Sequence, residues 1–139
     1  MLVISPNGVP RACEAARGWG ITVIEHPVRL EPLLTECDGV ISHGGMGLTS
    51  MALHGAKPLL LLPEHMEQAI LAYRLGRQGL AAATIRFKDK KTMHRRVQQL
   101  LFDADLRVRA GKFALRYKAF TPSQAVKSVI KMMNCSPDE

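Results

Sequence analysis

A cluster of glycines near the middle of the chain is the part of the sequence best suited to chemistry. The segment His43-Gly44-Gly45-Met46-Gly47 follows a short apolar run and precedes a stretch of helical periodicity. Glycines let the backbone approach a ligand closely, and a helix N-terminus presents unpaired N–H groups with a partial positive charge. The pattern therefore predicts that the backbone of 44–47 holds a phosphate group, with the His43 imidazole donating a hydrogen bond to it.

An acidic residue and an amide lie after the next apolar run. Glu67 and Gln68 follow the run 59–63, which ends in a proline. Carboxylate and amide groups together accept and donate the hydrogen bonds that the vicinal hydroxyls of a sugar require. Ligands of open parallel sheets bind beyond the carboxyl ends of the strands, where both segments are expected to lie. We therefore predict that the two segments form one site for a sugar linked to a pyrophosphate.

These residues also have purely structural interpretations. Tight turns use glycine for steric reasons alone, and a histidine at a strand end can serve only a local hydrogen bond. The methionines close to the glycines are more typical of packing than of redox chemistry. The other histidines show no spacing that places two of them on one helical face beside a carboxylate, so we expect no bound metal.

Short apolar runs alternate with longer helical segments along the first two-thirds of the chain, which is the pattern of an α/β fold with an open parallel sheet. We predict a Rossmann-like sheet flanked by helices over 1–88 and a helical C-terminal tail over 89–135, within one domain of 1–139. The expected strands are 2–5, 21–25, 39–42, 58–62 and 82–87. The expected helices are 11–18, 30–36, 47–54, 67–78, 90–102, 104–117 and 122–133.

The formal net charge of +7 indicates an anionic partner: a phosphorylated ligand, an acidic lipid surface or a nucleic acid. Nucleic acid is disfavoured because the basic tail has no interleaved aromatics and no known motif. The basic run of the tail is typical of a solvated helix face, and its alternative is peripheral contact with an anionic membrane. We find no spanning segment and no leader after Met1, and we expect a cytoplasmic protein. The run consists of Lys88, Lys90, Lys91, His94, Arg95 and Arg96.

The order of these residues resembles the C-terminal, donor-binding domain of GT-B-fold glycosyltransferases, in particular bacterial members of the UDP-glycosyltransferase family. That family has a motif close to HGGxGTxxEALxxGxP, followed by a strand and by P-x-x-x-(D/E)-Q. The separation of 24 positions between His43 and Glu67 matches the family spacing. The residues in register are His43, Gly44, Gly45, Gly47, Ala52, Leu53, Pro58, Pro63, Glu67 and Gln68.

The resemblance implies a role for each part of the site. His43 and the backbone of 44–47, including Met46, would bind the diphosphate of a nucleoside-diphosphate sugar, which is expected to be UDP-linked. Glu67 and Gln68 would bind the transferred sugar. Transfer in this family inverts the anomeric carbon and needs neither a metal nor a cofactor. The catalytic base would come from an N-terminal acceptor-binding domain or a separate subunit, so we expect no catalytic residue in this chain and no activity of the chain alone.

Two residues depart from the family motif at positions that touch the nucleotide. Leu48 stands where the family has a Thr or Ser that bonds a phosphate. Met51 stands where the family has a Glu that accepts hydrogen bonds from the ribose, and a thioether is a poor acceptor. The alternative function is therefore a non-catalytic binding or assembly module with a degenerate donor site.

Overall fold

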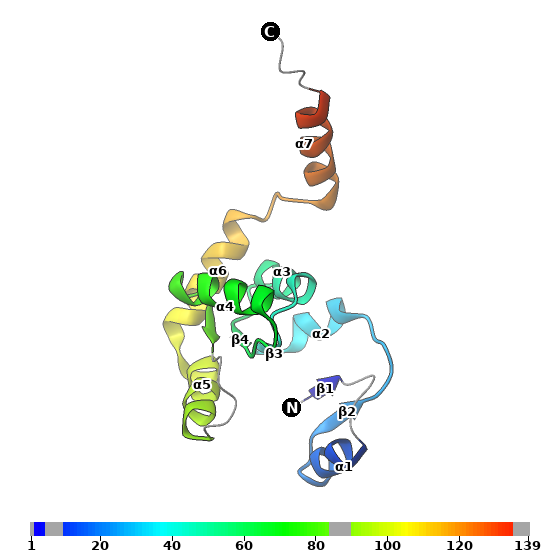
Figure 1. Ribbon diagram of the computed structural model, residues 1–139, viewed down its shortest axis with the longest axis vertical. Coiled ribbons are helices and arrows are strands. Elements are labelled where there is room, and N and C mark those ends of the chain that lie inside the picture. The colour runs from blue at the N-terminus through cyan, green and yellow to red at the C-terminus, as the bar shows by residue number, and fades with distance from the viewer. Residues whose placement is uncertain (1, 5–9, 84–89, 135–139) are drawn as a thin grey trace. The chain divides into compact units, whose positions relative to one another are not determined.

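The computed structural model describes residues 2–4, 10–83 and 90–134 of the 139-residue chain. Strands and helices alternate from β1 to β5, and three further helices follow (Figure 1). The internal contacts divide the chain into two compact units, Met1–Leu33 and Leu34–Glu139. The single domain of 1–139 therefore stays a prediction.

The first unit contains two parallel strands and the helix between them. Strand β1 (Leu2–Ile4) pairs with β2 (Thr22–Ile24), and Val3 lies opposite Val23. Helix α1 (Pro10–Gly18) connects the two strands and buries Cys13. Beyond β2, helix α2 (Leu30–Glu36) continues across the boundary of the two units.

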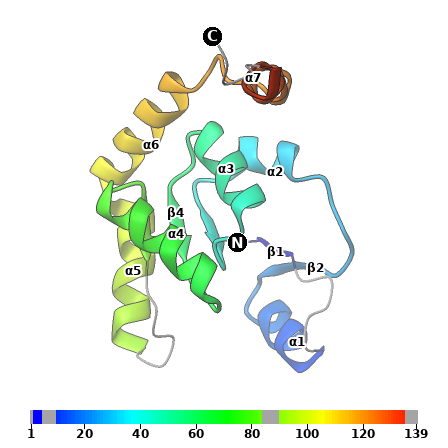
Figure 2. The same cartoon turned by 45° about the horizontal axis from the view of Figure 1, so that its top comes forward.

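The second unit is built on a three-stranded parallel sheet in the order β3-β4-β5. Each of these strands is followed by a helix, which is the chain order expected of βα repeats (Figure 2). The elements are β3 (Val40–Ser42), α3 (Met46–His54), β4 (Leu59–Leu61), α4 (Met66–Arg77) and β5 (Ala81–Ala83).

Strand β4 forms the centre of the core. Leu59, Leu60 and Leu61 are fully inaccessible to solvent, because helices cover both faces of a central parallel strand. Leu60 packs in a cluster with Ala82 of β5 and Leu100. A continuous apolar run predicts cover on both faces; this holds for β4 but not for β3, whose Ile41 is 45% exposed.

Three helices follow the sheet: α5 (Lys90–Phe102), α6 (Ala104–Arg116) and α7 (Pro122–Asn134). Asp103 begins α6, and its carboxylate accepts the N–H of Leu106 at 3.0 Å. That hydrogen bond lowers the pKa of Asp103, because it stabilises the charged form. Thr121 caps α7, since its Oγ1 accepts the N–H of Gln124 at 3.2 Å, as a Thr-Pro start predicts.

The predicted order of elements is confirmed, and the fold is an α/β fold with parallel strands and a helical tail. Strands β2, β3 and β4 are one or two residues shorter than predicted, and residue 5 of the predicted strand 2–5 lies outside the described part. The described strands form two sheets. The predicted strand 82–87 begins at Ala81, and its residues 84–87 lie outside the described part. Within the described ranges, no helix combines the length and the apolar character needed to cross a bilayer.

Candidate functional site

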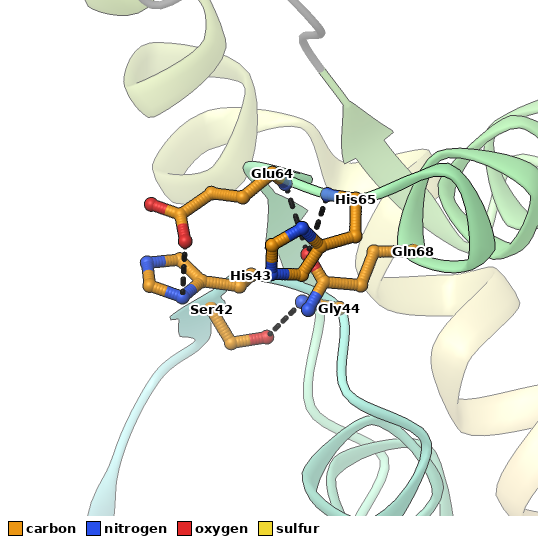
Figure 3. A network of polar contacts seen from close by, with 6 residues as sticks. All are labelled: Ser42, His43, Gly44, Glu64, His65 and Gln68. Atoms are coloured by element: carbon orange, nitrogen blue, oxygen red, sulfur yellow. Dashed lines mark hydrogen bonds and ion pairs between the residues drawn. The ribbon is translucent and has the colours of Figure 1, made fainter.

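The two predicted segments lie at the same edge of the sheet. Strands β3 and β4 are parallel neighbours, with Ser42 opposite Leu61. The Leu62 N–H donates to the Ser42 carbonyl at 2.9 Å, which extends the pairing to the last residue of β3. Because parallel strands end at one edge, the loop 43–45 and the loop 62–65 are adjacent (Figure 3). The predicted meeting of the two segments is thus confirmed.

Gly44, in the first of these loops, packs against the start of α4. Its φ of +88° lies in the region that favours glycine, and its N–H donates to the Ser42 Oγ at 3.2 Å. A Cβ on Gly44 would lie 3.7 Å from the carbonyl oxygen of Gln68 and 3.9 Å from Leu61 Cδ2. The turn therefore lies in van der Waals contact with the first turn of α4, and the positive φ rather than a lack of space favours glycine here.

The N-terminus of α3 carries unpaired backbone donors. Gly45 is the N-cap and supplies no side-chain cap, and the first helical hydrogen bond joins the Thr49 N–H to the Gly45 carbonyl at 3.1 Å. The N–H groups of 46–48 consequently have no acceptor one turn earlier in the helix. Cβ atoms on Gly45 and Gly47 would meet no described atom within 4 Å. This helix end can therefore accept an anion.

His43 lies at the rim of this turn beside Glu64. Its Nδ1 is 3.7 Å from Glu64 Oε2, and the two side chains are 60% and 53% exposed. The distance exceeds that of a hydrogen bond, so the contact stabilises the pair only when the imidazole is protonated. Glu64 lies three residues after the end of β4, and its position in the sequence gave no signal that it would approach His43.

Gln68 has a structural role that the sequence analysis missed. Its Oε1 accepts the N–H of Glu64 at 2.9 Å and the N–H of His65 at 3.3 Å (Figure 3). His65 is the N-cap of α4 and Gln68 its third residue, so the amide makes the side-chain half of a capping box. The sequence signal was a Gln three residues after the cap. The cap leaves the Nε2 donors for a ligand, and the role of Gln68 in sugar binding stays a prediction.

The substitution Gln68→Ala is expected to lower the free energy of unfolding by about 1 kcal/mol, because it removes a cap from α4. Denaturant unfolding of the chain followed by circular dichroism measures the change. Gln98→Ala, on an exposed position of α5, is the matched control and should leave the midpoint nearly unchanged. Equal midpoints for the two variants would contradict the capping role.

Glu67 lies in the first turn of α4 and is exposed. Met46 and Met66, the first residues of α3 and α4, are 58% and 76% exposed, so these two do not pack in the core as the methionines were predicted to. The described residues contain no group of three metal-ligating side chains.

The two departures from the motif lie on α3. Leu48 and Met51 are both half-buried. Thr49 carries a hydroxyl one position after Leu48, but it is only 2% exposed and its Oγ1 has no described partner. A side chain buried in this way cannot supply the missing hydroxyl to a phosphate outside the helix end.

No protein-family model matches the chain. Two curated proteins are similar to it in sequence, and both bear the name zeaxanthin glucosyltransferase. The protein of Pseudescherichia vulneris is 31% identical over 100 residues, which is 72% of this chain and 24% of the relative. The protein of Pantoea ananas is 26% identical over 103 residues, which is 74% of this chain and 24% of the relative.

Solved glycosyltransferase structures superpose on most of the chain. The structure of LpCGTa in complex with UDP has a TM-score of 0.72 at 19% identity, over 97% of this chain and 35% of that one. The chain has the fold of part of a GT-B glycosyltransferase. The GT-B structure of SnogD from Streptomyces nogalater gives a TM-score of 0.66 at 18% identity, over 94% of this chain and 41% of that one.

The chain spans about a quarter of the length of the curated relatives that it matches. A glycosyltransferase of that length therefore contains further structure outside the matched part. The predicted resemblance to GT-B glycosyltransferases is confirmed at the level of sequence and fold.

Proposed function

We propose that this chain is the donor-binding half of a glycosyltransferase that transfers a sugar from a nucleoside diphosphate to an acceptor hydroxyl. The observation that carries the proposal is the open N-terminus of α3, which lies beside the first turn of α4 at one edge of the sheet. Both relatives named above are glucosyltransferases, and LpCGTa was solved with UDP. We therefore take the donor to be a UDP-linked sugar.

The role proposed for the α3 terminus is to bind the diphosphate. The N–H groups of 46–48 and the imidazole of His43 would donate hydrogen bonds to its oxygens. These donors stabilise the charge that develops on the diphosphate as the sugar leaves, and that is the work a metal does in other transferases. The proposed transfer is accordingly metal-independent, and it inverts the anomeric carbon in a single displacement.

The sugar would lie over the first turn of α4. Glu67 is exposed there and accepts hydrogen bonds, and the Nε2 of Gln68 donates them. The acceptor and the base that activates its hydroxyl would come from the acceptor-binding domain or a separate subunit. The chain alone is therefore expected to bind the donor without transferring the sugar.

The alternative, a non-catalytic module, rests on Leu48 and Met51 alone, and the glycosyltransferase relatives do not favour it. The same two residues nevertheless predict that nucleotide binding is weaker than in a motif with Thr and Glu. Location in the cytoplasm stays a prediction, and contact of the basic tail with a membrane has no support from the relatives.

Titration of the chain with UDP tests the proposal. We expect saturable chemical-shift changes at the amides of 44–48 and of Glu67 and Gln68, and smaller changes with uridine, which lacks the diphosphate. His43→Ala should weaken binding about tenfold, which corresponds to one hydrogen bond to a charged group. His94→Ala, at an exposed position of α5, is the matched control. Absence of shifts at these amides with millimolar UDP would refute donor binding.

A further inference from the structure

A cavity lined by arginines lies at the edge of the sheet away from the proposed donor site. It has a volume of about 450 Å³, within the range of small-molecule sites. Gly79 and Ala81 line it where the chain enters β5, so it opens at the amino end of that strand. Because β4 and β5 are parallel, this is the edge opposite to the loops that follow β3 and β4. The cavity is thus separate from the donor site.

Three helices each bring one guanidinium group to the cavity: Arg77 from α4, Arg96 from α5 and Arg109 from α6. The described lining residues include no carboxylate. Asp105 lies 4.0 Å from Arg109 Nη1, but its side chain is 83% exposed and water weakens that contact. Asp103, which caps α6, also interacts electrostatically with Arg109. The cavity therefore carries an excess of positive charge, of which these two carboxylates offset a part at Arg109.

Neutral acceptors hold the three arginines in place. Arg109 Nε donates to the Gly79 carbonyl at 2.8 Å, and Arg96 Nη1 donates to Gln99 Oε1 at 2.8 Å. Arg77 Nη1 donates to the Tyr73 hydroxyl at 3.3 Å. These bonds orient the guanidinium groups before a ligand arrives, which reduces the ordering cost of binding.

Arg96 also has an unsatisfied donor. Its Nε is buried and has no hydrogen-bond partner among the described residues. A buried N–H without an acceptor is unfavourable, and that of a cation more so, because the group has lost its water. Because this Nε is closed to water, a ligand in the cavity would contact Arg96 through its terminal Nη groups, and the Nε would respond only to a movement of the guanidinium.

We propose that this cavity binds the phosphate group of a ligand other than the sugar donor. Guanidinium groups match the oxygens of a phosphate, and a tetrahedral dianion accepts hydrogen bonds from several directions at once. Three arginines on three helices fit that geometry better than the flat, two-sided geometry of a carboxylate. The phosphate comes either from a soluble phosphate ester or from a lipid headgroup.

Inorganic phosphate is the first probe, titrated into the chain at an ionic strength held constant with chloride. We expect saturable chemical-shift changes at the Nε–H signals of Arg96 and Arg109 and at the amide of Gly79. Any shifts of the amides of 44–48 should follow a separate binding curve, because those amides belong to the donor site. Arg96→Gln should weaken binding about tenfold or more. Arg95→Gln removes the same charge from an exposed neighbouring position outside the cavity and should change affinity less than about twofold.

Arg77→Gln is the second variant, because Arg77 is exposed and its loss leaves the core intact. It should weaken binding to a similar degree as Arg96→Gln. Sedimentation with phosphatidate vesicles, against phosphatidylcholine vesicles, distinguishes the two sources of phosphate. Binding of the free anion indicates a soluble ester, and Arg96-dependent binding to phosphatidate vesicles alone indicates a lipid. Equal losses in the Arg95 and Arg96 variants, or no binding to either probe, would overturn the proposal.

Discussion

Met51→Glu is expected to raise the affinity of the chain for UDP about tenfold to a hundredfold. Met51 lies on α3 one turn after Gly47, so both residues share a face of the helix, below the end that is proposed to hold the diphosphate. A carboxylate there can accept hydrogen bonds from the ribose hydroxyls, which a thioether does not. Such bonds to a charged group contribute about 1.5–3 kcal/mol, and calorimetric titration with UDP measures the gain.

Two comparisons separate this effect from a general change of charge. The gain should disappear with a UDP analogue whose ribose lacks both hydroxyls. Met46→Glu, which places the same charge at the exposed start of α3, should weaken UDP binding by repulsion of the diphosphate. If Met51→Glu leaves the affinity for UDP unchanged, the ribose does not lie over this part of α3.

Leu60→Ala is expected to reduce the free energy of unfolding by about 2–5 kcal/mol. Leu60 is fully buried at the centre of β4 and packs against Ala82 and Leu100, and Ala82 is too small to fill the space that the substitution leaves. The loss is a large part of the stability of a domain of this size. Chemical denaturation of the chain gives the change.

Ile41→Ala is the matched control for that loss. Ile41 lies directly opposite Leu60 in the pairing of β3 with β4, yet it is 45% exposed. The same chemical truncation should therefore cost well under half as much, because less apolar surface returns to water. Similar losses at the two positions would show that β4 is not the centre of the core.

The proposed site illustrates what a sequence pattern predicts well. The glycines at 44, 45 and 47 and the pair Glu67-Gln68 were assigned to one edge of a sheet, because parallel strands end on the same side, and the register of β3 with β4 confirms it. Gln68 has a role that the sequence analysis did not predict. Its amide oxygen caps α4, and the sequence analysis did not use the capping-box spacing that signals this role.

The sequence by itself determined the order of strands and helices, the glycine turn and the match to the glycosyltransferase motif. These features depend on periodicity and glycine content, which act over a few neighbouring residues. Only the tertiary structure decided which groups meet across long stretches of chain. The proximity of His43 to Glu64 and the gathering of Arg77, Arg96 and Arg109 around one cavity are of this kind. Such contacts depend on how helices pack on the sheet, and packing is set by the shapes of many side chains at once.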